Sequence, residues 1–175
     1  IDDPLIELVG INELNPDLNN WAYTLNYDSI YGQAKYKSKV KDKKITCNKK
    51  SIFTSINKDI RNVPWEEWGT EIIIDSSGVL ENIIKSRQII SNGCTKKVIF
   101  TNSPDKVDFT MVLGVNQKEY NPDKHHLIAS SICDATAIAP VSKIIDNLFK
   151  INNGYVTTLH PWLSYQNLMD GPSSS

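Results

Sequence analysis

The sequence predicts an α/β fold whose sheet is doubly wound and mostly parallel. Two apolar runs lead into polar residues: 5–11 (LIELVGI) is followed by Asn12 and Glu13, and the run in 70–78 (TEIIIDSSG) ends in small polar residues. A helical pattern follows each of them. Such runs are typical of strands that are buried on both faces of a parallel sheet. Further short apolar runs alternate with helical patterns, which favours the doubly wound arrangement.

In the first half of the chain, residues 15–27 (NPDLNNWAYTLNY) follow the first strand. They predict a helix with Asn15 as N-cap and Pro16 as its first residue. The lysine-rich residues 35–50 alternate with strand-forming side chains, which indicates antiparallel strands before the chain turns back at 63–69.

In the second half, helices and strands alternate. The predicted helices are 79–93, closed by Gly93, and 134–150, and the predicted strands are 70–78, 96–102, 109–116, 126–131 and 154–165. Ligands of a doubly wound sheet lie at the carboxyl ends of its strands. The residues that map to this edge are Glu13, Ser76, Ser77, Gly78 and Thr101.

The composition is that of an ordinary globular protein, with 40% hydrophobic and 22% charged residues. A net charge of −1 gives no electrostatic reason to expect a nucleic acid or an acidic membrane as partner. The lysine-rich stretch fits an exposed hairpin face better than a polyanion site. No apolar run approaches the roughly 20 residues that span a bilayer, and no leader pattern precedes the first strand, so we expect a cytoplasmic protein.

The three cysteines, Cys47, Cys94 and Cys133, have neither a disulfide pattern nor the spacing of a metal site, so no metal is expected. Cys133 precedes a helix of small residues, where the helix dipole and free N–H groups favour a thiolate. It is therefore a candidate nucleophile, and a buried, inert thiol is the alternative. For Cys47 and Cys94 we expect the inert role.

A nucleophilic cysteine needs a base, and the chain has three histidines. His125 and His126 lie in a polar turn, where solvent exposure is expected. His160 follows a β-rich segment and precedes a proline, so it is the better candidate for a Cys–His pair that attacks a carbonyl. The sequence alone leaves their proximity open.

Residues 130–140 (SSICDATAIAP) and 154–173 (GYVTTLHPWLSYQNLMDGPS) together resemble the active-site region of the glyceraldehyde-3-phosphate dehydrogenase family. The spacing of Cys133 and His160 matches the family's. Further landmarks follow in the family's order: INEL, YDSIYG, NVPW, DSSGV, KKVIFTNSP and GVNQKEYNP. The resemblance implies a Rossmann-type NAD-binding domain over 1–132, incomplete at its start, and the beginning of an α+β catalytic domain over 133–175.

The resemblance also implies roles for single residues. Cys133 would attack an aldehyde and pass through a thioester as hydride moves to NAD, with His160 as acid and base. The residues implied to bind the cofactor are Asn12, Glu13, Lys58, Ser77, Gly78 and Thr101. A carboxylate at Glu13 would accept the ribose hydroxyls and repel a 2′-phosphate, which favours NAD over NADP.

The chain departs from the family around the nucleophile. Ile132 and Asp134 replace two hydroxyl residues, and Leu163 stands where a threonine helps to bind substrate phosphate. An acid beside an incoming phosphate opposes binding, and it also opposes thiolate formation at Cys133, so Asp134 would alter substrate choice. Alternatively, Asp134 contributes a favourable charge to the first turn of the helix, or its side chain points away from the pocket.

Two function hypotheses follow. The first is an NAD-dependent phosphorylating aldehyde dehydrogenase, acting on a triose phosphate or another small aldehyde, with inorganic phosphate as a second substrate and a homotetramer as the family's usual assembly. The second is a non-catalytic paralogue that keeps the fold for binding or regulation. The family's glycine-rich loop is expected before Ile1 and the rest of its catalytic domain after Ser175, so we expect a fragment.

Overall fold

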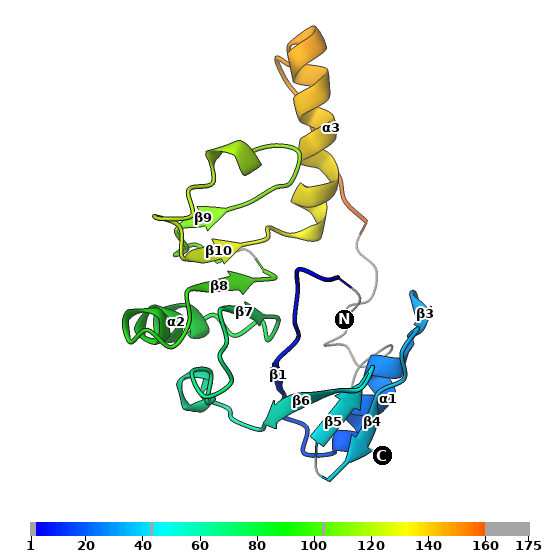
Figure 1. Ribbon diagram of the computed structural model, residues 1–175. Helices are drawn as coiled ribbons and strands as arrows, with labels where there is room; N and C mark the ends of the chain where they lie inside the picture. The colour runs from blue at the N-terminus through cyan, green and yellow to red at the C-terminus, as the bar shows by residue number, and fades with distance from the viewer. Residues whose placement is uncertain (1–2, 43, 103, 160–175) are drawn as a thin grey trace. The chain divides into compact units, whose positions relative to one another are not determined.

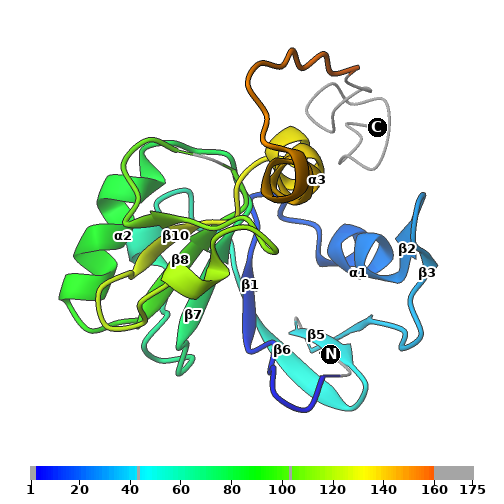
Figure 2. The ribbon, with the colours of Figure 1, turned by 90° about the horizontal axis from the view of Figure 1, so that it is seen from above.

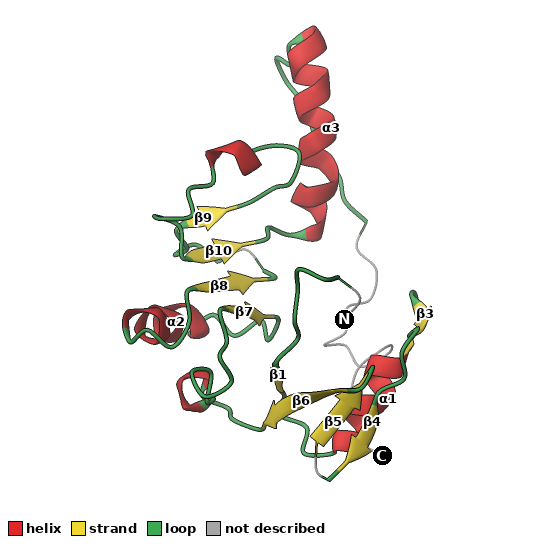
Figure 3. Cartoon of the chain, in the orientation of Figure 1, coloured by secondary structure: helices red, strands yellow, loops and turns green. Residues whose placement is uncertain are grey.

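The computed structural model describes residues 3–159 except Lys43 and Ser103 (Figure 1). These residues form two compact units, divided between Gly69 and Thr70. Each unit has its own sheet, flanked by helices, as the colouring by secondary structure shows (Figure 3).

The sheet of the first unit has the strand order β1-β6-β5-β4. Its strands are β1 (Gly10–Asn12), β4 (Lys39–Lys41), β5 (Lys44–Cys47) and β6 (Lys50–Ser55). β1 pairs with β6 in parallel, whereas β4, β5 and β6 form an antiparallel meander. The antiparallel strands expected in the lysine-rich segment are therefore confirmed. A separate two-stranded hairpin joins β2 (Tyr27–Asp28) to β3 (Gly32–Gln33).

Helix α1 (Leu18–Asn26) packs against one face of this sheet and closes its core. The buried core residues are Trp21, Ile45, Cys47 and Ile52. Cys47 is 3% exposed, which agrees with the inert role expected for it. The short helix η1 (Ile60–Asn62) follows β6.

Two details of the first unit differ from the prediction. The strand expected over 5–11 begins only at Gly10, where the ladder with β6 starts, and Leu5 and Ile6 are 92% and 65% exposed. The helix has Asp17 as its N-cap, not Asn15. The Oδ1 atom of Asn15 instead accepts from the Asp17 N–H at 2.9 Å, so the chain makes one more turn before the helix starts.

Gly10 lies beneath the ring of Trp68. A Cβ atom built on Gly10 would lie 2.2 Å from the nearest ring carbon, so no larger residue fits there unless the ring moves. The Trp68 ring in turn stacks on Phe53, with centroids 5.8 Å apart, and meets Trp65 edge to face at 5.5 Å. These aromatic contacts fix β1 and β6 against residues 63–69.

The second unit contains the parallel sheet β7-β8-β10-β9. Its strands are β7 (Ile72–Asp75), β8 (Lys97–Phe100), β9 (Phe109–Thr110) and β10 (Leu127–Ala129). Helix α2 (Asn82–Ser91) lies along one face of the sheet, and Gly93, at φ +79°, follows its end as expected (Figure 2). The parallel α/β prediction is thus confirmed.

Helix α3 (Cys133–Phe149) follows β10 directly, and the short helix η2 (Gln117–Glu119) precedes β10. The strand expected over 154–165 is absent from its described part, residues 154–159, which are exposed and irregular because none of the described strands pairs with them. No helix in the part of the chain that the structure describes is both long and apolar enough to cross a bilayer.

Asp108 ties three elements of the second unit together. Its Oδ2 atom accepts from the N–H groups of His126 and Leu127 at 2.9 and 2.8 Å, and its Oδ1 atom accepts from Arg87 of α2 at 3.0 Å. Burial raises the pKa of this carboxyl, but the two backbone N–H groups and the Arg87 guanidinium outweigh burial and hold the pKa below its usual value.

Asp108→Asn should therefore lower the free energy of unfolding by about 1.5–3 kcal/mol at neutral pH, because hydrogen bonds to a charged acceptor are lost. A lowered folded-state pKa stabilises the fold above the unfolded value of about 3.9 and ceases to do so as pH falls through the folded value. Urea unfolding at pH 7 and in steps toward pH 2 measures both effects. Asp105→Asn, at an exposed position, is the control; equal unfolding midpoints for both variants at pH 7 contradict the prediction.

Candidate active site

The carboxyl ends of β7, β8 and β10 lie at one edge of the second sheet, and several predicted site residues follow them. Thr101 N donates to Asp75 O at 3.0 Å, and Ser130 N donates to Phe100 O at 2.8 Å, so the three strand ends are tied in sequence. Ser77 and Gly78 follow β7, Thr101 follows β8, and Cys133 follows β10. Parallel pairing thus brings these four residues to the same edge.

Cys133 is the first residue of α3 and its side chain is exposed. Ser131, buried and at φ +67°, turns the chain sharply between β10 and the helix. Ile132 is the N-cap and makes no side-chain capping bond, so its side chain satisfies none of the first N–H groups of α3. The thiol therefore lies at the positive end of the helix dipole, as expected for a nucleophile.

Asp134 lies in the first turn of α3, next to the thiol. The Cys133 Sγ atom donates to Asp134 Oδ1 at 3.9 Å, a distance at the long end for a sulfur hydrogen bond. The carboxylate is therefore turned toward the nucleophile rather than away from it. Ile132, 46% exposed, adds an apolar surface beside the same thiol.

The loop after β7 is held by a buried network. Asp75 Oδ1 accepts from the N–H and the hydroxyl of Ser77 at 2.8 and 2.6 Å, and Asp75 Oδ2 accepts from the Asn82 amide at 2.9 Å. The Ser77 hydroxyl therefore stabilises the loop by a hydrogen bond within the protein. Gly78 has φ +72°, and apart from Gly78 and its two chain neighbours no atom of the described residues lies within 4 Å of the position a Cβ would take, so a ligand can approach its backbone closely.

The first unit carries the remaining predicted residues at the carboxyl end of β1. The Asn12 amide donates to Asn57 O and accepts from Asn57 N, both at 2.9 Å, so it fixes the loop after β6. Glu13 is exposed, and its Oε1 atom accepts from the N–H groups of Leu14 and Asn15 at 2.7 and 3.2 Å. The side chain of Lys58 is exposed in the same loop as Asn57.

Glu13 also lies at a cavity of about 270 Å³ between β1 and α1. The cavity is lined by Ile11, Glu13, Asn15, Asn20, Trp21, Thr24 and Leu25. Within the described chain no donor contacts the Oε2 atom of Glu13, which leaves this oxygen to accept from a ligand hydroxyl.

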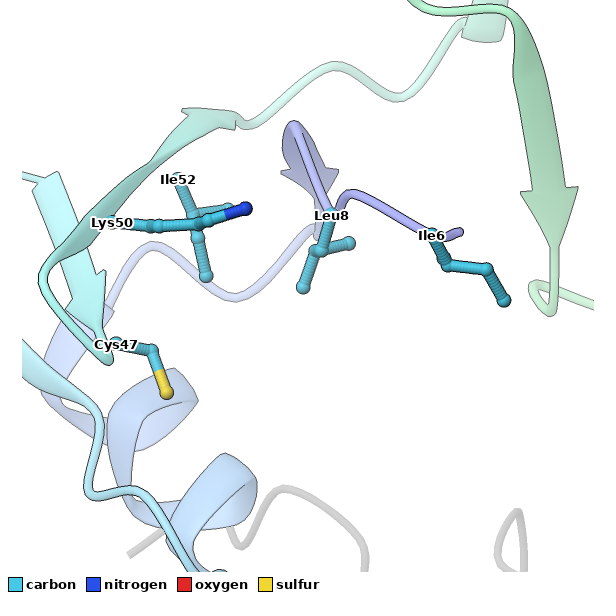
Figure 4. A pocket seen from close by; sticks show the side chains of 5 residues that line it. All are labelled: Ile6, Leu8, Cys47, Lys50 and Ile52. Atoms are coloured by element: carbon cyan, nitrogen blue, oxygen red, sulfur yellow. The ribbon is translucent and has the colours of Figure 1, made fainter. Parts of the chain in front are cut away.

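A second, smaller hollow surrounds Cys47 (Figure 4). Ile6, Leu8, Lys50 and Ile52 line it with Cys47, and its volume of about 10 Å³ is at the lower limit for a single water molecule. The Cys47 thiol is buried beside it and donates to Tyr36 O at 3.6 Å, so this hollow offers no substrate site. Cys94 is half-buried and free.

The structure tests the predictions for His125 and His126 but not the prediction for His160. His125 and His126 are half-buried rather than freely exposed: the His125 ring stacks on Phe109 with centroids 4.7 Å apart, and His126 Nδ1 lies 3.2 Å from Lys96 O. His160 and Leu163 lie outside the described residues. Among the residues that are described, no group of three His, Cys, Asp or Glu side chains is placed to hold a metal ion.

Comparison with known proteins identifies the family of the chain. Residues 1–83 match the family described as glyceraldehyde 3-phosphate dehydrogenase, NAD binding domain, and residues 132–175 match its C-terminal domain. The chain belongs to the glyceraldehyde-3-phosphate dehydrogenase family. The resemblance seen in the sequence is therefore confirmed, and NAD is the cofactor that this family's first domain binds.

Relatives of the family match almost all of the chain. Glyceraldehyde-3-phosphate dehydrogenase of Streptomyces coelicolor is 34% identical over 95% of this chain and 49% of the relative. The enzymes of Geobacillus stearothermophilus and Cochliobolus heterostrophus are 33% and 36% identical, over 98% and 97% of this chain and 51% and 49% of their own lengths. The chain thus spans about half the length of these relatives.

Sequence reasoning missed the residues that build the edge. Ser131 sets the direction of α3, but a serine in the left-handed region carries no recognisable pattern. Asp75 and Asn82 order the loop around Gly78, and the one signal was an aspartate that ends an apolar strand, followed two residues later by serine.

The contact between Asp134 and the thiol gives a direct test. Asp134→Asn should raise the rate at which iodoacetamide alkylates Cys133 near neutral pH by about 3–10-fold, because a negative charge next to a forming thiolate is removed. Asp146→Asn, in the last turns of the same helix, makes the same charge change and should leave the rate unchanged. Peptide mapping identifies the labelled cysteine, and a rate equal to wild type for Asp134→Asn contradicts the prediction.

Proposed function

We propose that the full-length protein is an NAD-dependent phosphorylating aldehyde dehydrogenase. The observation that carries the proposal is the exposed Cys133 at the N-terminus of α3, at the carboxyl edge of a parallel sheet. The family membership of both matched segments supports the same activity.

In the proposed reaction the Cys133 sulfur adds to the carbonyl carbon of the aldehyde and gives a thiohemiacetal. His160 first donates a proton to the developing alkoxide and then removes the proton of the same hydroxyl, so that hydride leaves the carbon and a thioester remains. NAD, when bound, supplies the hydride acceptor. Inorganic phosphate then attacks the acyl carbon, the C–S bond breaks, and the acyl phosphate departs with the thiolate restored.

Each unit separately contains groups that suit part of a dinucleotide. Glu13 keeps the Oε2 atom to accept hydrogen bonds from ribose hydroxyls, and Gly78 leaves open space above its backbone. Thr101 is exposed beside that loop, and Lys58 is exposed in the other unit. The side chains of Asn12 and Ser77 are hydrogen-bonded within the protein, which supports a positioning role for both. Ser77 would contact the ligand through its backbone.

The substrate pocket is proposed to differ from one that binds a triose phosphate. The Asp134 carboxylate turned toward Cys133 would repel a phosphate, and Ile132 replaces a polar group with an apolar one. The replacement of a threonine by Leu163 also favours weaker binding of a substrate phosphate. These changes favour an aldehyde with fewer or no phosphate groups.

We also propose a boundary at residue 132, with an NAD-binding domain before it and the start of a catalytic domain after it. The second family match begins at residue 132, which supports this division. A homotetramer, expected from the family, and a cytoplasmic location, expected from the sequence, complete the proposal.

The full-length protein should reduce NAD in the presence of aldehydes, and Cys133→Ser should abolish the reaction because the thioester cannot form. Glyceraldehyde 3-phosphate, with and without inorganic phosphate, is compared with unphosphorylated short-chain aldehydes by NADH absorbance. Faster turnover with unphosphorylated aldehydes is expected.

Phosphate-dependent turnover of the triose phosphate at the higher rate would show that the pocket has not changed. Measurable NAD binding without turnover of any aldehyde would instead favour a non-catalytic paralogue. Cys94→Ser serves as the matched control, since Cys94 lies outside the proposed site, and it should keep wild-type turnover.

Glu13→Gln should narrow the preference for NAD over NADP by about 10-fold or more, because the amide no longer repels the 2′-phosphate. Dissociation constants for NAD and NADP, measured by fluorescence titration, give the ratio. Glu7→Gln, at an exposed position before β1, is the control, and an unchanged ratio in Glu13→Gln argues against the assigned role.

A further inference from the structure

The chain contains two Asn–Gly pairs, Asn92–Gly93 and Asn153–Gly154, and the structure gives them opposite environments. An asparagine that precedes a glycine is prone to spontaneous deamidation, because glycine has no Cβ to hinder ring closure between its backbone nitrogen and the asparagine side chain. Ring closure also needs that nitrogen free of hydrogen bonds and the asparagine backbone free to rotate. The fold therefore sets the rate, and the two pairs can be compared within one molecule.

Asn92–Gly93 closes helix α2 in a Schellman motif. The Gly93 N–H donates to Ile90 O at 2.9 Å. The Cys94 N–H donates to Ile89 O at 3.1 Å, which completes the motif. Asn92 is the C-cap residue, with φ −81° and ψ −3°, and Gly93 has φ +79°. Attack of the Gly93 nitrogen on the Asn92 side chain requires this helix end to open, so the pair is protected although both residues are exposed.

Asn153–Gly154 lies in an open segment. Residues 151–159, part of the orange trace after α3 in Figure 2, form no helix or strand and are all exposed. The N–H groups of Lys150 and Ile151 still donate to Asp146, at 3.0 and 3.1 Å. Two residues further on, the Gly154 N–H has no hydrogen-bond acceptor among the described residues.

The space around Gly154 is also open. A Cβ built on Gly154 would meet no atom of the described residues within 4 Å, its two chain neighbours apart, and its φ lies outside the left-handed region. Neither a hydrogen bond nor packing therefore opposes the rotation that brings the Gly154 nitrogen to the Asn153 side chain.

We propose that Asn153 is a deamidation site, which converts in water to aspartate and isoaspartate. The deprotonated Gly154 nitrogen attacks the Asn153 Cγ atom, a C–N bond forms, and the side-chain nitrogen leaves as ammonia. Water then opens the five-membered imide at one of its two C–N bonds. Breaking the new bond to Cγ gives aspartate, whereas breaking the original peptide bond gives isoaspartate. Water is the one co-reactant, and no atom changes its oxidation state.

The modification changes the segment that joins the two proposed catalytic residues. Either product adds a negative charge, and isoaspartate also adds a methylene group to the main chain. Asn153 lies in the sequence between Cys133 and His160, so the isoaspartyl form lengthens the connection between the nucleophile and the base. We therefore expect isoaspartate to lower aldehyde turnover, an expectation that rests on the proposed function.

The test incubates the full-length protein in mildly alkaline buffer, where a backbone nitrogen deprotonates more readily, and follows both Asn–Gly peptides by mass spectrometry. Conversion to either product raises the peptide mass by about 1 Da. The Asn153 peptide should convert at least about 10-fold faster than the Asn92 peptide, because α2 must first open locally at Asn92. In concentrated urea the two peptides should convert at similar rates, since the Schellman motif is lost.

Gly154→Ala is the matched variant, because the structure leaves room for its Cβ. It should slow conversion at Asn153 about 10-fold or more, since the Cβ hinders ring closure, and should leave the rate at Asn92 unchanged. Urea midpoints establish that the variant is folded.

Equal conversion of the two peptides in the folded protein, or an Asn153 peptide that does not convert, would overturn the proposal. The masses report the modification whether or not the protein oxidises an aldehyde, so its failure is distinguishable from failure of the proposed function. In the active enzyme, turnover should fall as isoaspartate accumulates in the wild type and persist in Gly154→Ala. Constant turnover in the isoaspartyl form would overturn the effect assigned to the longer main chain.

Discussion

The candidate active site depends on the pairing of β8 with both β7 and β10. All of these pairings are parallel, so every strand of this group ends at the same edge and passes its chain into a loop or a helix there. The buried side chains of Val98, Phe100 and Leu127 hold the group in register. A one-residue slip would turn these side chains to the opposite face, so the core that stabilises the unit also positions its chemistry.

At that edge, local backbone strain and side-chain hydrogen bonds set the finer geometry. Ser131 adopts a left-handed conformation that costs a non-glycine residue about 1–2 kcal/mol, and the conformation sends α3 away from β10 with Cys133 at its first position. In the other unit the hydrogen bonds between the Asn12 side chain and the Asn57 backbone join the end of β1 to the loop after β6. Each unit thus fixes its candidate ligand-binding loops by contacts within the protein.

Much of this arrangement could be predicted from the sequence. The apolar run that ends in small polar residues located β7, the alternation of helices and strands located β8, and the pattern of small residues after Cys133 located α3. Prediction failed where the outcome depended on a partner distant in sequence. Residues 5–8 look like a strand but form no ladder with a described strand, and residues 154–159 have the right composition and no described strand to pair with.

The helix cap of α1 shows a second kind of failure, because Asn15 and Asp17 are both good caps and a hydrogen bond between them decides which one serves. The residues of the candidate site likewise include some that could be predicted from the sequence and some that could not. Cys133 was evident from its place before a helix, whereas Asp75, Asn82 and Ser131 act through tertiary contacts or backbone angles that single-residue patterns do not encode.

The close approach of Gly10 to Trp68 links the interior of the first unit to its surface. Any side chain at position 10 would push on the Trp68 ring, and that ring forms the support beneath the exposed ring of Phe53. Evolutionary change at this half-buried glycine is therefore constrained by two demands at once, the position of β1 and the orientation of the exposed Phe53 ring. A substitution at Gly10 would therefore change the surface around Phe53 without changing any exposed side chain.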